Sequence, residues 1–240
     1  MPDQDVTIQS SARERRRPEP EPVELTVLYE DAAIVALDKP AGMVVHPTYK
    51  NTSGTLLNGV LWRYRDRRDI QPGILTRLDK ETSGVVVVAL TPALHARLQR
   101  DAATGRVTKE YLAIVRGAPD PARGIITLPL ARDAQDRRRV VVTESGAACE
   151  TRYEVVRRVD RCDWSVVRCE LITGRTHQIR VHLSALGCPV VGDATYGEAH
   201  EAIPRQALHA WRVSLLHPVT RDRLSIEAPL PRDFRDLMTP

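Results

Sequence analysis

The stretch "ILTRLDKETSGVVVVAL", residues Ile74 to Leu90, decides how the core of this chain is built. Its four consecutive valines, residues 85–88, predict a strand that is buried on both faces. Arg77 and Asp79 precede that strand and share a face if the backbone there is extended. An arginine beside a carboxylate keeps it ionised, and an ionised carboxylate is a usable nucleophile or base. A structural role for Asp79, as a turn cap or in an ion pair, is the alternative interpretation.

Apolar spacing outside this stretch predicts helices at three places: residues 55–64, 91–103 and 175–187. Asn51 and Ser53 are the cap candidates for the first helix, and Thr91, followed by a proline, begins the second. Thr176 is placed to cap the third helix, which Gly187 is placed to end.

The rest of the chain consists mainly of β-like runs separated by turns. These runs cover residues 23–30, 32–37, 106–117, 124–130, 137–143, 149–159, 164–172, 208–218 and 223–231. Many strands and a few helices without regular alternation predict an α+β fold around a largely antiparallel sheet. We expect one catalytic domain over residues 23–240, preceded by a disordered, basic and proline-rich tail at residues 1–22.

The chain is mildly basic, with a formal net charge of +4 and a pI of about 9.0. Only four of the 35 basic residues are lysines, and arginine is the better partner for phosphates and bases. A codon bias toward arginine explains the same count. The four cysteines show no CxxC pairing, so we expect reduced thiols. Because neither a membrane-spanning stretch nor a signal core is recognisable, we expect a cytoplasmic protein.

The segment "GRTHQIR", residues 174–180, is a second candidate for chemistry. Arg175 and His177 lie where the third helix is expected to start, and free backbone N–H groups there favour anions. Arg180 lies one turn further and can share their surface, facing either a phosphate or Asp79. A zinc site would need His177 and another helix histidine five residues on, about 140° away around the helix. We therefore expect no metal.

The strand-like "KEYLAIVRG", residues 109–117, is the third candidate. Lys109 and Tyr111 share one face if this run is a strand. Tyr111 is either an ordinary aromatic residue of a sheet or a ring on which a nucleic-acid base stacks.

These motifs together resemble the RluA-type RNA pseudouridine synthases. "RLDKETSG", "KEYLAIVRG" and "GRTHQIRVHLSALGCPVVGDATYG" occur in that family's order, and "DKPAGMVVHP" and "LHAWRVSLLHP" resemble its flanking segments. The resemblance runs from about Val23 to Phe234. It implies a pseudouridine synthase fold, in which a mixed, mostly antiparallel sheet flanked by helices is bisected by an RNA-binding cleft. It also implies isomerisation of uridine in structured RNA, either ribosomal RNA of the large subunit or transfer RNA, without metal or organic cofactor.

The resemblance also implies roles for individual residues. Asp79 corresponds to the catalytic aspartate, Tyr111 to the tyrosine that stacks on the flipped-out base, and Arg180 to the arginine that pairs with the aspartate. The remaining residues that we expect to contact RNA or line the cleft are Arg77, Arg175, His177, Thr82 and Lys109. Whether Asp79 attacks the sugar, attacks the base or removes a sugar proton stays open.

The chain departs from the family pattern at two places. Thr76 stands where the family usually has a histidine, so we expect activity to survive with an altered contact to RNA. An S4 RNA-binding domain, present in many relatives, does not fit into residues 1–22, so we expect the catalytic domain to bind RNA alone, as a monomer. Two other hypotheses stay open, a catalytically silent RNA-binding protein that retains the cleft, and a metal-dependent hydrolase.

Overall fold

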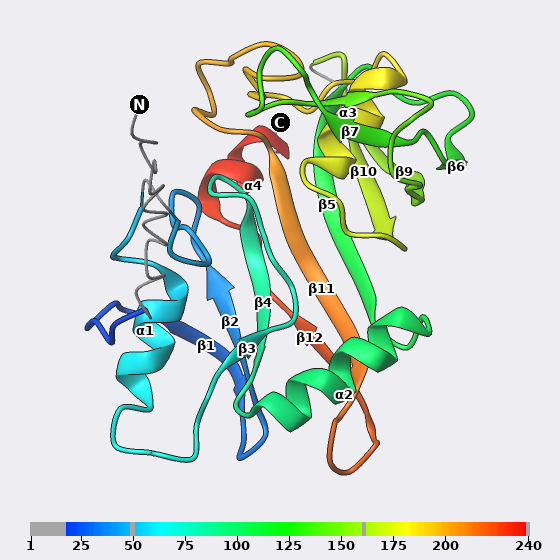
Figure 1. The fold of residues 1–240 in the computed structure, drawn as a ribbon. Helices are drawn as coiled ribbons and strands as arrows, with labels where there is room; N and C mark the ends of the chain where they lie inside the picture. The colour runs from blue at the N-terminus through cyan, green and yellow to red at the C-terminus, as the bar shows by residue number, and fades with distance from the viewer. Residues whose placement is uncertain (1–17, 49–50, 160–161, 239–240) are drawn as a thin grey trace, which may run out of the picture.

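The computed structural model describes residues 18–48, 51–159 and 162–238. A ten-stranded sheet organises these residues, with the strand order β1-β2-β4-β11-β5-β10-β9-β6 and with β3 and β12 paired to β4 and β11 (Figure 1). The strands of this sheet are β1 Thr26–Glu30, β2 Ile34–Lys39, β3 Gly73–Ile74, β4 Ser83–Ala89, β5 Thr108–Arg116, β6 Arg123–Ile126, β9 Thr151–Val159, β10 Trp164–Leu171, β11 Leu208–Leu216 and β12 Arg223–Glu227. A separate hairpin is formed by β7 Leu130–Arg132 and β8 Val140–Val142.

The valine run forms β4, as predicted, and every residue of this strand is buried. Val86 and Val88 pack into one apolar cluster with helix α1, Leu56–Arg63, whereas Val85 and Val87 pack into another with helix α2, Pro92–Ala103. Both faces are covered, which is why this strand is apolar throughout instead of alternating.

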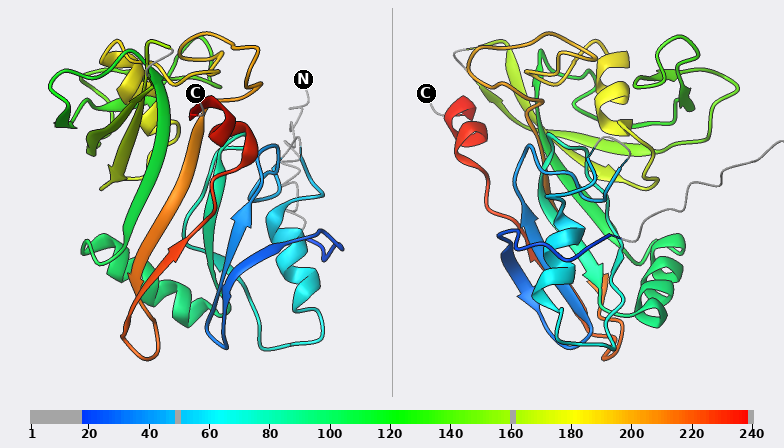
Figure 2. Two further views of the ribbon diagram at one scale, coloured as in Figure 1. Left: turned by 180° about the vertical axis from the view of Figure 1, so that it is seen from behind. Right: turned by 60° about the vertical axis from the view of Figure 1, so that its left-hand side comes forward.

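A parallel pairing joins the two halves of the sheet. Strand β11 runs between β4 and β5 (Figure 1, Figure 2) and pairs with β4 at His209↔Ser83 and Ala210↔Gly84. Gly84 has a φ of +112°, and a Cβ placed on it would lie 2.1 Å from the carbonyl oxygen of Ala210. Only glycine allows the two backbones to approach this closely. The sheet is therefore mixed and mostly antiparallel, as the resemblance implies.

The helix ends differ from the predictions at two of three places. Helix α2 has Thr91 as its N-cap, as expected. Helix α1 is capped by Thr55 and not by Asn51 or Ser53, because Thr55 and Asn58 form a capping box. Helix α3, Gln178–Ala185, has His177 at its N-cap and so starts one residue later than a cap at Thr176 requires. Its C-terminal end follows the prediction, with a left-handed glycine directly after the C-cap.

Helix α4, Arg232–Met238, was not predicted from the sequence. Its Phe234 is fully buried in the larger apolar cluster, and its Asp233 forms an ion pair with Arg205. The helix is only seven residues long, so its stability comes from these contacts and not from a sequence pattern.

Most of the predicted tail, residues 1–22, lies outside the described residues. In the part that the structure describes, the Glu19 carbonyl accepts a hydrogen bond from Asn58 Nδ2, and the Glu21 carboxylate accepts one from the backbone of Gly54. These contacts attach residues 19–21 to the start of α1. No helix among the described residues is long and apolar enough to span a bilayer.

Candidate active site

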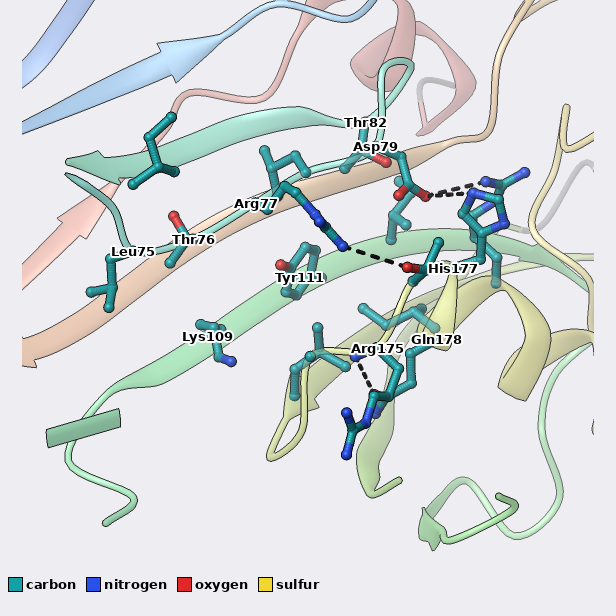
Figure 3. Close-up of a pocket in the computed structure, with 18 of the residues that line it drawn as sticks. Leu75, Thr76, Arg77, Asp79, Thr82, Lys109, Tyr111, Arg175, His177 and Gln178 are labelled. Carbon is teal, nitrogen blue, oxygen red and sulfur yellow. Dashed lines mark hydrogen bonds and ion pairs between the residues drawn. The ribbon is translucent and has the colours of Figure 1, made fainter. Parts of the chain in front are cut away.

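A cleft of about 310 Å³ opens on the sheet face that carries Tyr111 (Figure 3). Three segments line it: the loop before β4 that carries Asp79, the first half of β5, and the turn that leads into α3. His46, Leu171 of β10 and Leu208 of β11 complete the lining. The three stretches that the sequence singles out therefore meet in one place, although they are far apart along the chain.

The loop that carries Asp79 is held by backbone contacts on both sides. The Thr82 N–H donates to the Asp79 carbonyl at 3.1 Å, closing the turn. The ammonium of Lys39 donates to three carbonyl oxygens, those of Pro40, Met43 and Lys80, at 2.8 to 2.9 Å. Lys39 is fully buried, and burial lowers its pKa to about 7. This buried cation ties the loop after β2 to the residue that follows Asp79.

Arg180 connects Asp79 to a second, deeper carboxylate. Its Nη1 lies 3.1 Å from Asp79 Oδ2, while Nε and Nη2 lie 2.6 and 2.8 Å from the two oxygens of Asp193. Burial alone would lower the pKa of Arg180, but the two carboxylates outweigh it and the pKa is raised. The bidentate contact with Asp193 fixes the plane of the guanidinium, so Nη1 is aimed at Asp79.

His177 lies beside this ion pair in a left-handed backbone conformation, with a φ of 56°. Its Nε2 is 3.8 Å from Asp79 Oδ2 and its Nδ1 is 2.7 Å from the hydroxyl of Tyr196. Burial lowers the pKa of His177, and Asp79 acts in the opposite direction. A histidine held at positive φ carries backbone strain, which is common in residues of functional sites.

Tyr111 forms the floor of the cleft and is 6% exposed. Burial and the negative charge of Asp79 raise the pKa of its phenol, so the ring stays neutral. Lys109 shares this face of β5, and burial lowers its pKa. Glu110 lies on the opposite face, where it pairs with Arg168 and Arg212. The predicted alternation of β5 is therefore confirmed.

Comparison with known proteins identifies the chain. Residues 33–185 match the family described as RNA pseudouridylate synthase. A relative named "Uncharacterized RNA pseudouridine synthase YlyB", from Bacillus subtilis, is 40% identical over 223 residues, covering 91% of this chain and 73% of that protein.

This chain belongs to the RNA pseudouridylate synthase family. A relative named "Ribosomal large subunit pseudouridine synthase D", from Pseudomonas aeruginosa, is 39% identical over 232 residues, covering 90% of this chain and 72% of the relative. The predicted RluA-type resemblance is confirmed, and the synthase is an isomerase that acts on RNA.

Solved structures of human proteins share the fold. "Human RNA Pseudouridylate Synthase Domain Containing 1" superposes with a TM-score of 0.69 at 28% identity, covering 87% of this chain and 84% of that chain. "Human RNA Pseudouridylate Synthase Domain Containing 4" gives 0.68 at 25% identity, covering 88% and 90%. The predicted pseudouridine synthase fold is confirmed by these two structures.

The other predicted site residues of the synthase also line the cleft. Arg77 and Arg175 are exposed, and neither has a carboxylate partner among the described residues. Arg77 Nη2 lies 3.5 Å from the Thr176 hydroxyl (Figure 3). The Thr82 hydroxyl is buried and accepts a hydrogen bond from Gln206, so its visible contact is with the protein.

Thr76, which replaces the usual histidine of the family, is turned away from solvent. Its hydroxyl accepts a hydrogen bond from the Val87 N–H at 3.0 Å, which fastens the loop to β4. Among the described residues there is no cluster of three or more potential metal ligands. His182, the second histidine of the zinc interpretation, instead contacts Thr151 and the Leu128 carbonyl from a fully buried position.

Three residues that hold this site were missed in the sequence analysis. Lys39, Asp193 and Tyr196 lie in the segments "DKPAG" and "GDATYG", which were noted only as part of the resemblance. A fourth, Gln178, accepts from the Arg175 N–H and donates to the Glu150 carbonyl, so it shapes the turn before α3 (Figure 3). For Lys39, Asp193 and Tyr196 the available signal was a polar residue next to glycine or proline, and for Gln178 it was the position inside "GRTHQIR".

Proposed function

We propose that this synthase converts specific uridines of structured ribosomal RNA of the large subunit to pseudouridine, with Asp79 as the catalytic carboxylate. The observation that carries the proposal is the asymmetric environment of this carboxylate. Arg180 and His177 both face Oδ2, whereas no described residue donates a hydrogen bond to Oδ1. One oxygen is held by the protein and the other is left for the substrate.

The reaction is a rearrangement within one nucleotide. The bond between N1 and C1′ breaks, a bond between C5 and C1′ forms, C5 loses a proton and N1 gains one. Atoms and electrons balance without an oxidant or reductant. Asp79 acts at C1′, at the base or on a sugar proton, and the Arg180 guanidinium, 3.1 Å from Oδ2, holds its carboxylate in place.

The cleft accepts a single nucleotide taken out of its stack. A base inside a helix cannot reach a carboxylate at the bottom of a cleft, so the target uridine is flipped out. Tyr111 offers a neutral ring that replaces the lost stacking, worth about 1–3 kcal/mol where base stacking on aromatic residues has been measured. Arg77 and Arg175, at the cleft mouth, contact the phosphates on either side, and Lys109, His177 and the Thr82 turn line the pocket.

The choice of ribosomal RNA rests on relatives whose names specify the large ribosomal subunit. Transfer RNA is the second candidate substrate. We further propose that residues 23–240 act as one catalytic domain, as a monomer in the cytoplasm, where both RNAs occur.

The test is an Asp79→Asn variant, which keeps the shape of the side chain and removes its charge. We expect pseudouridine formation in large-subunit RNA transcripts to fall by at least about 10³-fold, while RNA binding is retained. Asp69→Asn, at an exposed ion pair with Arg67, is the matched control and should remain active. Nucleoside mass spectrometry measures the product, with transfer RNA transcripts assayed in parallel.

The alternatives give different results in the same assay. Full activity of Asp79→Asn would overturn the catalytic assignment. A wild-type protein that binds structured RNA and leaves every uridine unmodified would support the silent RNA-binding protein. Activity that excess chelator abolishes would support a metal-dependent enzyme.

A further inference from the structure

Tyr196 lies behind the catalytic ion pair, in the loop that follows α3, and contacts three parts of the site. Its hydroxyl lies 2.7 Å from His177 Nδ1 and accepts the backbone N–H of Val140 in β8 at 2.8 Å. The guanidinium carbon of Arg180 lies 5.0 Å from the centre of its ring. Tyr196 is not among the residues that line the cleft, so any effect on the reaction passes through its neighbours.

The hydrogen bonds around the Tyr196 hydroxyl favour one tautomer of His177. The Val140 N–H occupies one acceptor site of the oxygen, so the hydroxyl hydrogen is free to be donated to Nδ1. A histidine that accepts at Nδ1 carries its own hydrogen on Nε2 when neutral. Nε2 faces Asp79 Oδ2 at 3.8 Å, so this tautomer presents an N–H to the catalytic carboxylate.

The ring of Tyr196 also connects the site to the β7–β8 hairpin. It packs against an apolar cluster formed by Leu130, Val140, Cys149 and Val181, which joins the hairpin to α3. The guanidinium carbon of Arg139, the residue directly before β8, lies 5.6 Å from the centre of the ring. The position of Tyr196 is therefore fixed from the side away from the cleft, which makes it a rigid support.

We propose that Tyr196 is a positioning residue of the isomerisation, which holds His177 as the Nε2–H tautomer facing Asp79 and supports the guanidinium of Arg180. The inference rests on the proposed role of Asp79. Its consequence is that Asp79 Oδ2 faces two N–H groups, and that Oδ1 is directed to the nucleotide. The left-handed backbone at His177 has a reason in this arrangement, since the ring must reach both Asp79 and Tyr196.

The charges around His177 come from several segments. Asp79 before β4 and Asp193 after α3 raise its pKa, whereas Arg180 on α3 and Arg132 on β7 lower it together with burial. A hydrogen bond donated to Nδ1 stabilises the neutral ring. Removal of the Tyr196 hydroxyl therefore raises the pKa of His177.

The experiment is a Tyr196→Phe variant, which keeps the ring over Arg180 and removes the hydroxyl. Histidine carbon–proton NMR of the RNA-free protein, with the signal of His177 assigned by its loss in His177→Gln, follows the titration. We expect a higher titration midpoint in Tyr196→Phe and a kcat lowered by about 3- to 10-fold with little change in KM. The matched control is Tyr29→Phe in β1, which removes a hydroxyl that donates a hydrogen bond to Asp31.

A pair of substitutions at His177 tests the tautomer without changing Tyr196. Glutamine extends a side-chain amide N–H to the place of Nε2, whereas asparagine reaches only the place of Nδ1. We expect His177→Gln to be more active than His177→Asn, and Tyr196→Phe to have little further effect in the His177→Gln background.

Three results would overturn the proposal: an unchanged His177 midpoint in Tyr196→Phe, greater activity of the asparagine variant, or additive effects of the two substitutions. The NMR titration needs no RNA and no turnover. If Asp79→Asn proves active, the proposed function fails while the titration still reports whether Tyr196 holds His177.

Discussion

At the scale of single residues, the site depends on a carboxylate that does not line the cleft. Asp193 is 1% exposed and gives both of its oxygens to Arg180, leaving Nη1 of that arginine for Asp79. The arginine is thus oriented by one acid in order to hold another. This division leaves one guanidinium nitrogen for Asp79 Oδ2, while no described residue donates a hydrogen bond to Oδ1.

Asp193→Ala should destabilise the protein strongly, because it leaves the buried Arg180 with a single partner. We expect the free energy of unfolding to fall by about 3–5 kcal/mol, measured by urea denaturation. Asp69→Ala removes an exposed ion pair and should leave the free energy of unfolding nearly unchanged. Equal losses for the two variants would contradict the role of Asp193.

Some of this site follows from sequence and some does not. That Arg77, Asp79 and Tyr111 share one cleft could be predicted only through the resemblance to the family, because period-two spacing is local and cannot bring separate motifs together. Asp193 and Tyr196 could not be assigned, because their partners are brought to them only by the packing of α3 against the β7–β8 hairpin.

At the scale of elements, the sequence predicted a helix start correctly where the capping residues alone determine it. Helix α2 starts at Thr91 because a capping hydroxyl and a first-turn proline are enough to start a helix. Helix α3 starts later than its Thr176 suggests, because the turn is shaped by Gln178 and the strained His177. The short helix α4 was not predicted for the same reason: contacts with distant residues stabilise it, and no local sequence signal marks it.

The junction of β4 and β11 provides a prediction at this scale. Gly84→Ala puts a Cβ against the Ala210 carbonyl and forces an L-residue to a φ of +112°, so we expect a loss of at least about 3 kcal/mol in the free energy of unfolding. Gly105→Ala, at a φ of +74° with nothing within 4 Å of the new Cβ, isolates the cost of backbone conformation. That control should lose about 1 kcal/mol. Similar losses for Gly84→Ala and Gly105→Ala would show that the space between β4 and β11 accommodates the added Cβ.

At the scale of the whole molecule, polar groups buried in the sheet connect stability to pH. His209 of β11 is fully buried between the Ser83 hydroxyl, at 2.9 Å, and the Ala228 carbonyl, at 3.3 Å. Burial lowers its pKa from 6.5 to about 4. It thereby joins β4, β11 and the chain after β12 as long as its ring is neutral.

The free energy of unfolding should therefore fall as the pH falls from 6.5 to 4. In that window the unfolded chain binds a proton on His209 and the folded one does not, which costs about 3 kcal/mol by pH 4. His209→Gln should flatten this part of the profile, measured as urea midpoints at successive pH values. His200→Gln, in the loop before β11, is the control. Parallel profiles for wild type and His209→Gln would contradict the assignment.

The distance along the chain between the two members of the Asp79–Arg180 ion pair has a consequence for biosynthesis. Asp79 and Arg180 are 101 residues apart, and they come from opposite sides of the β4–β11 junction. A ribosome therefore completes the acid well before its counter-ion, and the strand that joins the two halves is made later still. Since Leu208 of β11 lines the cleft and β11 pairs with both β4 and β5, we expect the cleft to be complete only after translation has passed β11.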